Sequence, residues 1–155
     1  MPADIGTDHF DIDSYEQIQD VVQHAMRGAQ KGNRKTLRRA FHEKAQMFGE
    51  VMGTRYDEGI ESFFDLCEKH PLGKPLGKGD RDRYRSRIVS ITRVGDAAMV
   101  MVAEDGCWGS AAFVDFFTVT RIGRDWKITN KTFAFTGGKI PAEVVGRTPR
   151  TRRGN

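Results

Sequence analysis

The sequence predicts an α+β fold in which three helices occupy the first half of the chain and a curled antiparallel sheet occupies the second half. Apolar residues recur every three or four positions up to about residue 69, which is the period of a helix with one buried face. From Tyr84 onward they alternate with polar residues, as in a strand. The joints between the late runs, at 95–96, 106–109 and 123–125, are short, so neighbouring strands must run antiparallel.

The length of 155 residues suits one domain, which we divide into a flexible lead at 1–12, a folded domain at 13–140 and a basic, disordered tail at 141–155. The formal charge of +4 equals the four arginines among the last nine residues, so the folded body is near neutral. We therefore favour a solvated tail over a contact with phosphate or acidic lipid, and we expect no nucleic-acid partner.

The cysteine content and the hydropathy of the chain indicate a reduced, cytoplasmic setting. Cys67 and Cys107 are too few for a disulfide framework. The first residues, MPADIGTDHF, lack the apolar core of a leader peptide, and no run approaches the roughly 20 apolar residues of a membrane helix. We therefore expect no membrane association.

Capping patterns locate the helices of the first half. Asp13, with Glu16 three residues later, predicts the start of a helix over about 14–30 that ends near Gly32. Asn33 predicts the cap of a short second helix. A short strand is expected at 46–49 and a turn at 52–54, followed by a third helix that Asp57 caps and that ends near residue 69. The Gly- and Pro-rich segment 71–83 predicts a loop.

The last two strands, 113–135, should form a hairpin that organises the domain. A three-residue loop at 123–125 would pair Phe117 with Lys131 and Asp115 with Phe133. One face would then carry Phe113, Asp115, Phe117, Lys131, Phe133 and Phe135, and the other Val114, Phe116, Thr118, Trp126, Ile128 and Asn130. Because both faces are partly apolar, we expect one to cover a core and the other an interface.

Several phrases of the sequence resemble the nuclear-transport-factor-2-like superfamily, which includes ketosteroid isomerase, scytalone dehydratase and the SnoaL-type cyclases. FHEKAQMF, FVDFF and DWKITNKTF are most similar to the branch labelled "putative lumazine-binding", over residues 13–136. The resemblance implies a cone-shaped, curved antiparallel sheet packed on three N-terminal helices, with a deep pocket between them. It also implies a homodimer through the outer face of the sheet.

The resemblance does not extend to the ketosteroid isomerase mechanism. That mechanism needs a carboxylate base, a tyrosine and a protonated acid. The tyrosine position falls on Ala25 and the base position on Gly49, which leaves only Asp115 for the acid on the later strand. Scytalone-type dehydration would rely on a histidine and tyrosines, for which His42 and Tyr56 are available.

Asp115 and Lys131 are the most informative pair, because an acid and a base on an aromatic face can bind or protonate a ligand. A plain cross-strand ion pair remains the alternative. Our candidate catalytic residues are Asp115 and His42. The candidate ligand-binding residues are Lys131, Asn130, Trp108, Tyr56, Phe48, Phe64, Phe117 and Phe133. We expect no metal, because the histidines show no ligand spacing, and no cofactor.

These residues predict a homodimeric protein whose pocket binds a small hydrophobic or aromatic molecule. Isomerase or dehydratase activity by acid/base chemistry would suit an apolar cavity with few ionisable groups. The alternative is a non-catalytic interaction module whose cavity is filled by side chains and whose sheet face binds a partner. The lumazine label implies a ligand class, and nothing in these residues independently selects a pteridine.

Overall fold

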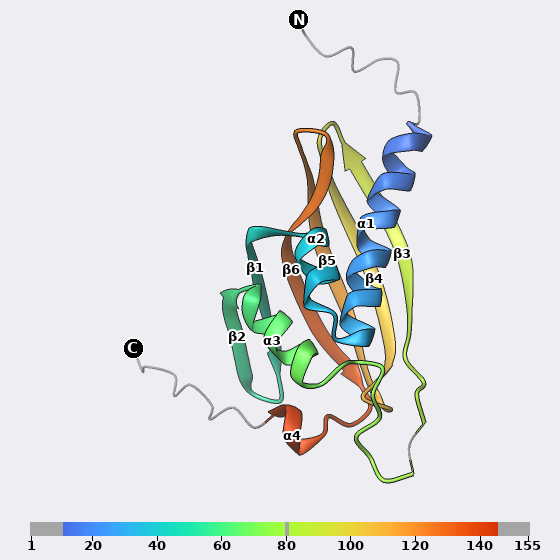
Figure 1. Cartoon of the computed structure of the whole chain (residues 1–155), viewed down its shortest axis with the longest axis vertical. Coiled ribbons are helices and arrows are strands. Elements are labelled where there is room, and N and C mark those ends of the chain that lie inside the picture. The colour runs from blue at the N-terminus through green and yellow to red at the C-terminus, as the bar shows by residue number, and fades with distance from the viewer. Residues whose placement is uncertain (1–10, 80, 146–155) are drawn as a thin grey trace, which may run out of the picture.

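The computed structural model describes residues 11–79 and 81–145 (Figure 1). The elements in chain order are α1 (Ile12–Lys31), α2 (Arg34–Ala40), β1 (Phe41–Val51), β2 (Thr54–Gly59), α3 (Glu61–Lys69), β3 (Arg85–Val94), β4 (Ala97–Cys107), β5 (Ala111–Ile122), β6 (Asp125–Gly137) and α4 (Ala142–Val145). The three predicted helices and the four late strands are therefore present. Residues 1–10 of the predicted lead (1–12) and residues 146–155 of the predicted tail (141–155) lie outside the described residues. Within the predicted tail, residues 142–145 form α4.

The first helix begins two residues earlier than the sequence indicates. The carboxylate of Asp11, and not that of Asp13, accepts hydrogen bonds from the backbone N–H of Ser14 at 3.1 Å and from its hydroxyl at 2.7 Å. These bonds also lower the pKa of Asp11. Gly32, in the left-handed region at φ 67°, ends the helix as predicted. Asn33 caps α2 by accepting from the N–H of Thr36 at 3.1 Å.

The region after α2 differs most from the prediction. β1 is a long strand that follows α2 directly, where a short strand at 46–49 was expected. Met52 and Gly53 both have positive φ and form a two-residue hairpin turn into β2. Asp57 therefore lies opposite Phe48 in a strand and does not cap a helix. α3 starts after Ile60 and has no side-chain cap.

All six strands form one sheet in the order β2-β1-β6-β5-β4-β3. β3 to β6 make the predicted antiparallel meander. The predicted α+β fold class is confirmed, with one addition: β1 pairs with β6 in parallel, so the sheet as a whole is mixed. A parallel pair needs a long connection between its strands, and the chain from β2 to β5 provides it between β1 and β6.

The register of the β5–β6 hairpin determines which side chains share the inner face. Phe117 lies opposite Lys131, and Asp115 lies opposite Phe133, as predicted. The turn has two residues, since Ile122 pairs with Asp125, and a bulge between 118 and 119 restores the register of a three-residue loop.

The bulge corrects one prediction about the faces of the hairpin. Between the turn and the bulge, the even-numbered residues of β6 face inward, whereas beyond the bulge the odd-numbered ones do. Trp126 and Ile128 are therefore buried on the inner face and do not lie on the outer one. Asn130, beyond the bulge, is on the outer face with Thr118.

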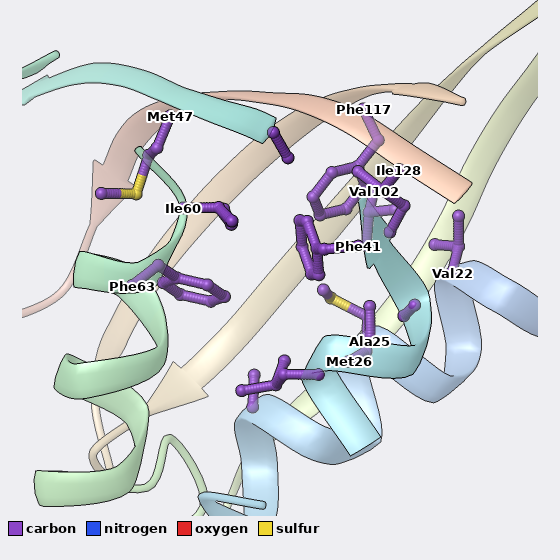
Figure 2. Packing of buried hydrophobic residues seen from close by; sticks show 14 of the residues in the cluster. Val22, Ala25, Met26, Phe41, Met47, Ile60, Phe63, Val102, Phe117 and Ile128 are labelled. Atoms are coloured by element: carbon purple, nitrogen blue, oxygen red, sulfur yellow. The ribbon is translucent and has the colours of Figure 1, made fainter. Parts of the chain in front are cut away.

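The helices cover the inner face of the sheet and enclose the core (Figure 1). Phe41 lies at its centre, with ring centroids 5.5 Å from Phe64 and 6.1 Å from Phe117. Val22, Ala25 and Met26 of α1 pack from one side (Figure 2). Phe63 of α3 and Met47 of β1 lie at the other side (Figure 2). These two residues also line a pocket.

Candidate functional site

A pocket lies between α3, the inner face of β1, β4, β5 and β6, and the short helix α4. Its walls are mainly apolar and include Met47, Phe63, Leu66, Trp108, Phe113 and Phe133. The centres of water-sized molecules can occupy about 100 Å³ of it. One water needs roughly 10–15 Å³ on this measure, so the pocket has room for a small organic molecule.

The mouth of the pocket is partly covered by the segment after β6. Ile140, Val144 and Val145 contribute apolar side chains to the lining. The backbone N–H of Lys139 donates to the hydroxyl of Ser110 at 3.1 Å, which attaches this segment to the start of β5. Part of the predicted basic tail thus belongs to the pocket.

Three ionisable side chains cross the floor of the pocket on neighbouring strands. Asp115 of β5 and Lys131 of β6 are joined by a 2.9 Å bond from Nζ to Oδ1. Glu104 of β4 lies diagonally from Asp115, because Val102 pairs with Asp115 and Glu104 with Phe113. All three are buried, at 5% exposure for Glu104, 0% for Asp115 and 5% for Lys131. We call these three residues the floor triad.

The ammonium of Lys131 has a largely aromatic surrounding. It lies 4.6 Å from the ring centroid of Phe63, 4.7 Å from that of Phe133 and 5.9 Å from that of Phe117. The negative ring faces stabilise its charge at a position where the side chain is largely buried. Burial alone would favour the neutral amine, but the carboxyl groups of Asp115 and Glu104 outweigh it and raise the pKa of Lys131.

The arrangement of Glu104 and Asp115 favours one proton between the two carboxyl groups. Glu104 Oε2 accepts a hydrogen bond from the Cys107 thiol at 3.4 Å, while Glu104 Oε1 and Asp115 Oδ2 are buried with no donor among the described residues. Two carboxylates with facing unpaired oxygens would repel each other, whereas one added proton satisfies both atoms. Burial first, and then the charge of Asp115 and hydrogen bonding to it, raise the pKa of Glu104 well above its ordinary value.

Sequence reasoning missed Glu104, although one signal was present. Val100 and Val102 are fully buried, and Glu104 continues their alternation on the same strand face. A carboxyl group at an inward position of an apolar run needs a polar partner. Asp115, on the neighbouring strand β5, is that partner.

The tryptophan and the tyrosine among the candidates both line the pocket. Trp108 has φ 53° and donates from its indole nitrogen to the carbonyl of His70 at 2.8 Å, which fixes its ring against Phe113. Tyr56 of β2 packs on Phe133 with ring centroids 5.9 Å apart.

Gly49 explains why the pocket has no base at the ketosteroid isomerase position. Gly49 lies opposite both Tyr56 and Phe133 in the sheet. A Cβ atom there would be 2.6 Å from Cε1 of Phe133, so the ring occupies the place of a side chain. Glu50, the next residue, is exposed on the other face, and Ala25 is buried in the core.

The structure does not bring the other candidates into the pocket. His42 is the second residue of β1, where its Nδ1 accepts from the N–H of Lys44 at 3.0 Å instead of bonding a helix carbonyl. Asn130 donates to the hydroxyl of Thr132 at 3.0 Å. Phe48 is 50% exposed on the outer face, whereas Phe64 and Phe117 are core residues beside the pocket.

Other kinds of site find little support in the part of the chain that the structure describes. No group of three His, Cys, Asp or Glu side chains there could hold a metal ion. Cys67 and Cys107 are buried free thiols, and burial raises the pKa of both, which disfavours a nucleophilic thiolate. Over residues 11–79 and 81–145, no helix is both long and apolar enough to cross a membrane.

Comparison with solved structures identifies the fold. An NTF2-like protein of unknown function from Shewanella baltica OS155 is 23% identical, with a TM-score of 0.71 over 82% of this chain and 97% of that one. A second, from Methylobacillus flagellatus KT, is 26% identical, with a TM-score of 0.70 over 81% and 94%. A putative ketosteroid isomerase from Shewanella frigidimarina NCIMB 400 is 16% identical, with a TM-score of 0.55 over 76% and 94%.

The comparison with curated proteins found no match. The family described as "Putative lumazine-binding" matches residues 13–134, which is most of the chain and nearly all of the described domain. The helices, the curved sheet and the pocket floor all lie within or beside this range. The chain therefore belongs to the "Putative lumazine-binding" family of the nuclear-transport-factor-2-like superfamily.

Proposed function

We propose that this protein binds a small hydrophobic or aromatic molecule in the pocket between α3 and the inner face of the sheet. The observation that carries the proposal is the combination of apolar walls with a buried floor triad. Ligand sites of this kind use a few polar groups to orient a mainly apolar molecule. A pocket filled by its own side chains would gain nothing from three buried ionisable groups, because each costs desolvation energy.

The family description supports a small-molecule ligand, and the lining residues suit a flat one. Trp108, Phe113, Phe133 and Tyr56 present aromatic surfaces to the pocket. Nothing among these residues selects a pteridine over another ring system.

The proposal places the protein in the cytoplasm, a setting supported by its two free, buried cysteines.

A pocket-filling substitution tests the proposal. Ser62, in the first turn of α3, is half-buried and lines the pocket. In a thermal-shift screen of metabolites, ligands at about 100 times their Kd should stabilise the wild-type protein by about 3 kcal/mol. Ser62→Trp should abolish the increase in Tm for the same compounds, because the indole occupies their space. Ser90→Trp, at an exposed position of β3, is the matched control and should retain it.

Two outcomes of this screen would contradict the proposal. One is that no compound raises the Tm of the wild-type protein. The other is that the hits stabilise Ser62→Trp as much as Ser90→Trp, which would mean that they bind elsewhere.

A second candidate function, acid/base catalysis on the bound molecule, rests on the proton between Glu104 and Asp115. A neutral acid beside a carboxylate in an apolar site can donate a proton to a substrate and take it back. Isomerisation and dehydration need such a pair. In this assignment Glu104 and Asp115 carry the chemistry, and His42, which does not line the pocket, does not. Glu104→Gln should then abolish turnover of a substrate and retain its binding.

We also propose that the outer face of the sheet forms a homodimer interface. Phe48, Met99 and Phe116 are 50%, 50% and 39% exposed on this face, and Phe48 and Phe116 flank Thr132 on adjacent strands. An exposed apolar patch of neighbouring residues is typical of an interface. The same face would serve the alternative function, a non-catalytic interaction module.

Charge at the centre of this face should prevent association. Phe116→Glu would place two like charges near the symmetry axis of a dimer and should yield monomers at concentrations where the wild-type protein is dimeric. Val94→Glu, at an 80% exposed position next to the β3–β4 turn, is the control and should remain dimeric. Sedimentation velocity measures both. A monomeric wild-type protein, or a dimeric Phe116→Glu, would exclude this interface.

A further inference from the structure

The floor triad specifies more about the ligand than its size. This inference rests on the proposed function, since it assumes that the pocket is occupied by a small molecule. It starts from a count of charges and hydrogen-bond donors on the pocket floor.

The charges of the floor triad cancel. Lys131 carries one positive charge, and its ammonium donates to Oδ1 of Asp115 at 2.9 Å. One proton between the unpaired oxygens Oε1 of Glu104 and Oδ2 of Asp115 leaves the two carboxyl groups with a single negative charge together. The net charge at the floor is therefore zero. A charged ligand would bring an unbalanced charge into an apolar space, at a high desolvation cost.

The hydrogen-bond donors of the Lys131 ammonium outnumber the acceptors that it contacts. An ammonium carries three N–H donors. Within the described residues, Lys131 donates one hydrogen bond, to Asp115, and the aromatic rings nearest to it are those of Phe63 and Phe133. Aromatic faces attract a cation but are weaker acceptors than a carbonyl oxygen. At least one donor of a pocket-lining ammonium is thus available to a ligand acceptor.

We propose that the pocket takes an uncharged, mainly apolar ligand with a hydrogen-bond acceptor, such as an aromatic ketone, and that Lys131 donates to this acceptor. The aromatic ring of the ligand packs between Phe63, Trp108 and Phe133. The acceptor reaches the ammonium at the floor. Asp115 holds that ammonium in position and balances its charge, and the carboxyl group of Glu104 is neutral.

Four one-ring compounds of nearly equal size test the ligand class: acetophenone, ethylbenzene, benzoate and benzylamine. Their Kd values for the wild-type protein would be measured at pH 7 by NMR titration. We expect acetophenone to bind about tenfold or more tightly than ethylbenzene, because it gains a hydrogen bond to a charged donor. Benzoate and the benzylammonium ion should bind more weakly than ethylbenzene.

The outcomes separate this inference from the proposed function. Benzoate binding as tightly as acetophenone would overturn the neutral-ligand inference but leave a ligand pocket in place. Ethylbenzene binding as tightly as acetophenone would overturn the role of Lys131 in the same way. Failure of all four compounds to bind at millimolar concentration would overturn both the inference and the proposed function.

A double variant assigns the donor. Asp115→Asn with Lys131→Met removes the ammonium without leaving an unpaired charge, and we expect it to bind acetophenone and ethylbenzene equally. A retained tenfold preference for the ketone would overturn the assignment. Infrared spectroscopy of the wild-type protein provides a second test, which does not require the double variant to fold. The carbonyl stretching band of acetophenone, isotopically labelled at that carbon, should move to lower wavenumber on binding, relative to its position in hexane, and an unmoved band would equally overturn the assignment.

Discussion

Replacing Lys131 with methionine should lower the free energy of unfolding by about 3–5 kcal/mol, because it leaves Asp115 as an uncompensated charge at 0% exposure. Methionine fills much of the space of the lysine chain, so lost packing contributes little to this effect. Urea unfolding followed by circular dichroism measures it.

Two controls distinguish charge from packing in this experiment. Lys35→Met removes an exposed lysine of α2 and should change stability by less than about 0.5 kcal/mol. Asp115→Asn with Lys131→Met should recover most of the loss, since no buried charge remains. A single Lys131→Met variant as stable as Lys35→Met would show that the ion pair does not have the buried geometry described here.

The stability of the wild-type protein should fall with rising pH because of Glu104. Its folded-state pKa lies well above the ordinary 4.5, first because of burial and then because of the charge of Asp115. The native state therefore keeps a proton that the unfolded chain releases above about pH 4.5. The stabilisation is complete below that pH and is lost progressively as the pH rises towards the folded-state pKa. Over this window one proton changes the unfolding equilibrium by up to about tenfold per pH unit.

Glu104→Gln isolates this contribution, since glutamine remains a neutral hydrogen-bonding group at every pH. We expect the variant to gain stability relative to the wild-type protein as the pH is raised from 4 to 8, as measured by urea unfolding. Glu16→Gln, at an exposed position of α1, should follow the wild-type profile. If Glu104→Gln and the wild-type protein show parallel pH profiles, Glu104 is not protonated in the native state.

Local sequence patterns predicted the helices, the late strands and the pair at the centre of the site. Residue alternation in the last hairpin is strong, and a short turn fixes which residues meet. Phe117 was therefore matched correctly with Lys131, and Asp115 with Phe133. The predicted three-residue loop was wrong in detail, but a two-residue turn and a one-residue bulge shift the register by the same amount.

The errors concern long-range pairing. β2 contains the polar residues of RYDEG, which alone favour a helix cap, and only its pairing with β1 makes it a strand. The parallel contact of β1 with β6 joins segments more than 80 residues apart, which no local pattern encodes. Glu104 was overlooked for a different reason: it continues the alternation of Val100 and Val102, but the significance of a buried carboxyl depends on its partner Asp115 on the neighbouring strand.

The central claim is that a ligand pocket lies above the floor triad. An NMR titration tests it most directly: acetophenone is added to protein that is labelled with carbon-13 in its methionine methyl groups. Met47 lines the pocket, whereas Met99 and Met101 lie on β4 outside it, Met101 opposite Phe116 of the outer face. The account predicts a saturable shift of the Met47 signal, with the signals of Met99 and Met101 unchanged. Shifts of Met99 and Met101 with an unchanged Met47 signal would contradict it, because the ligand would then bind the outer face of the sheet.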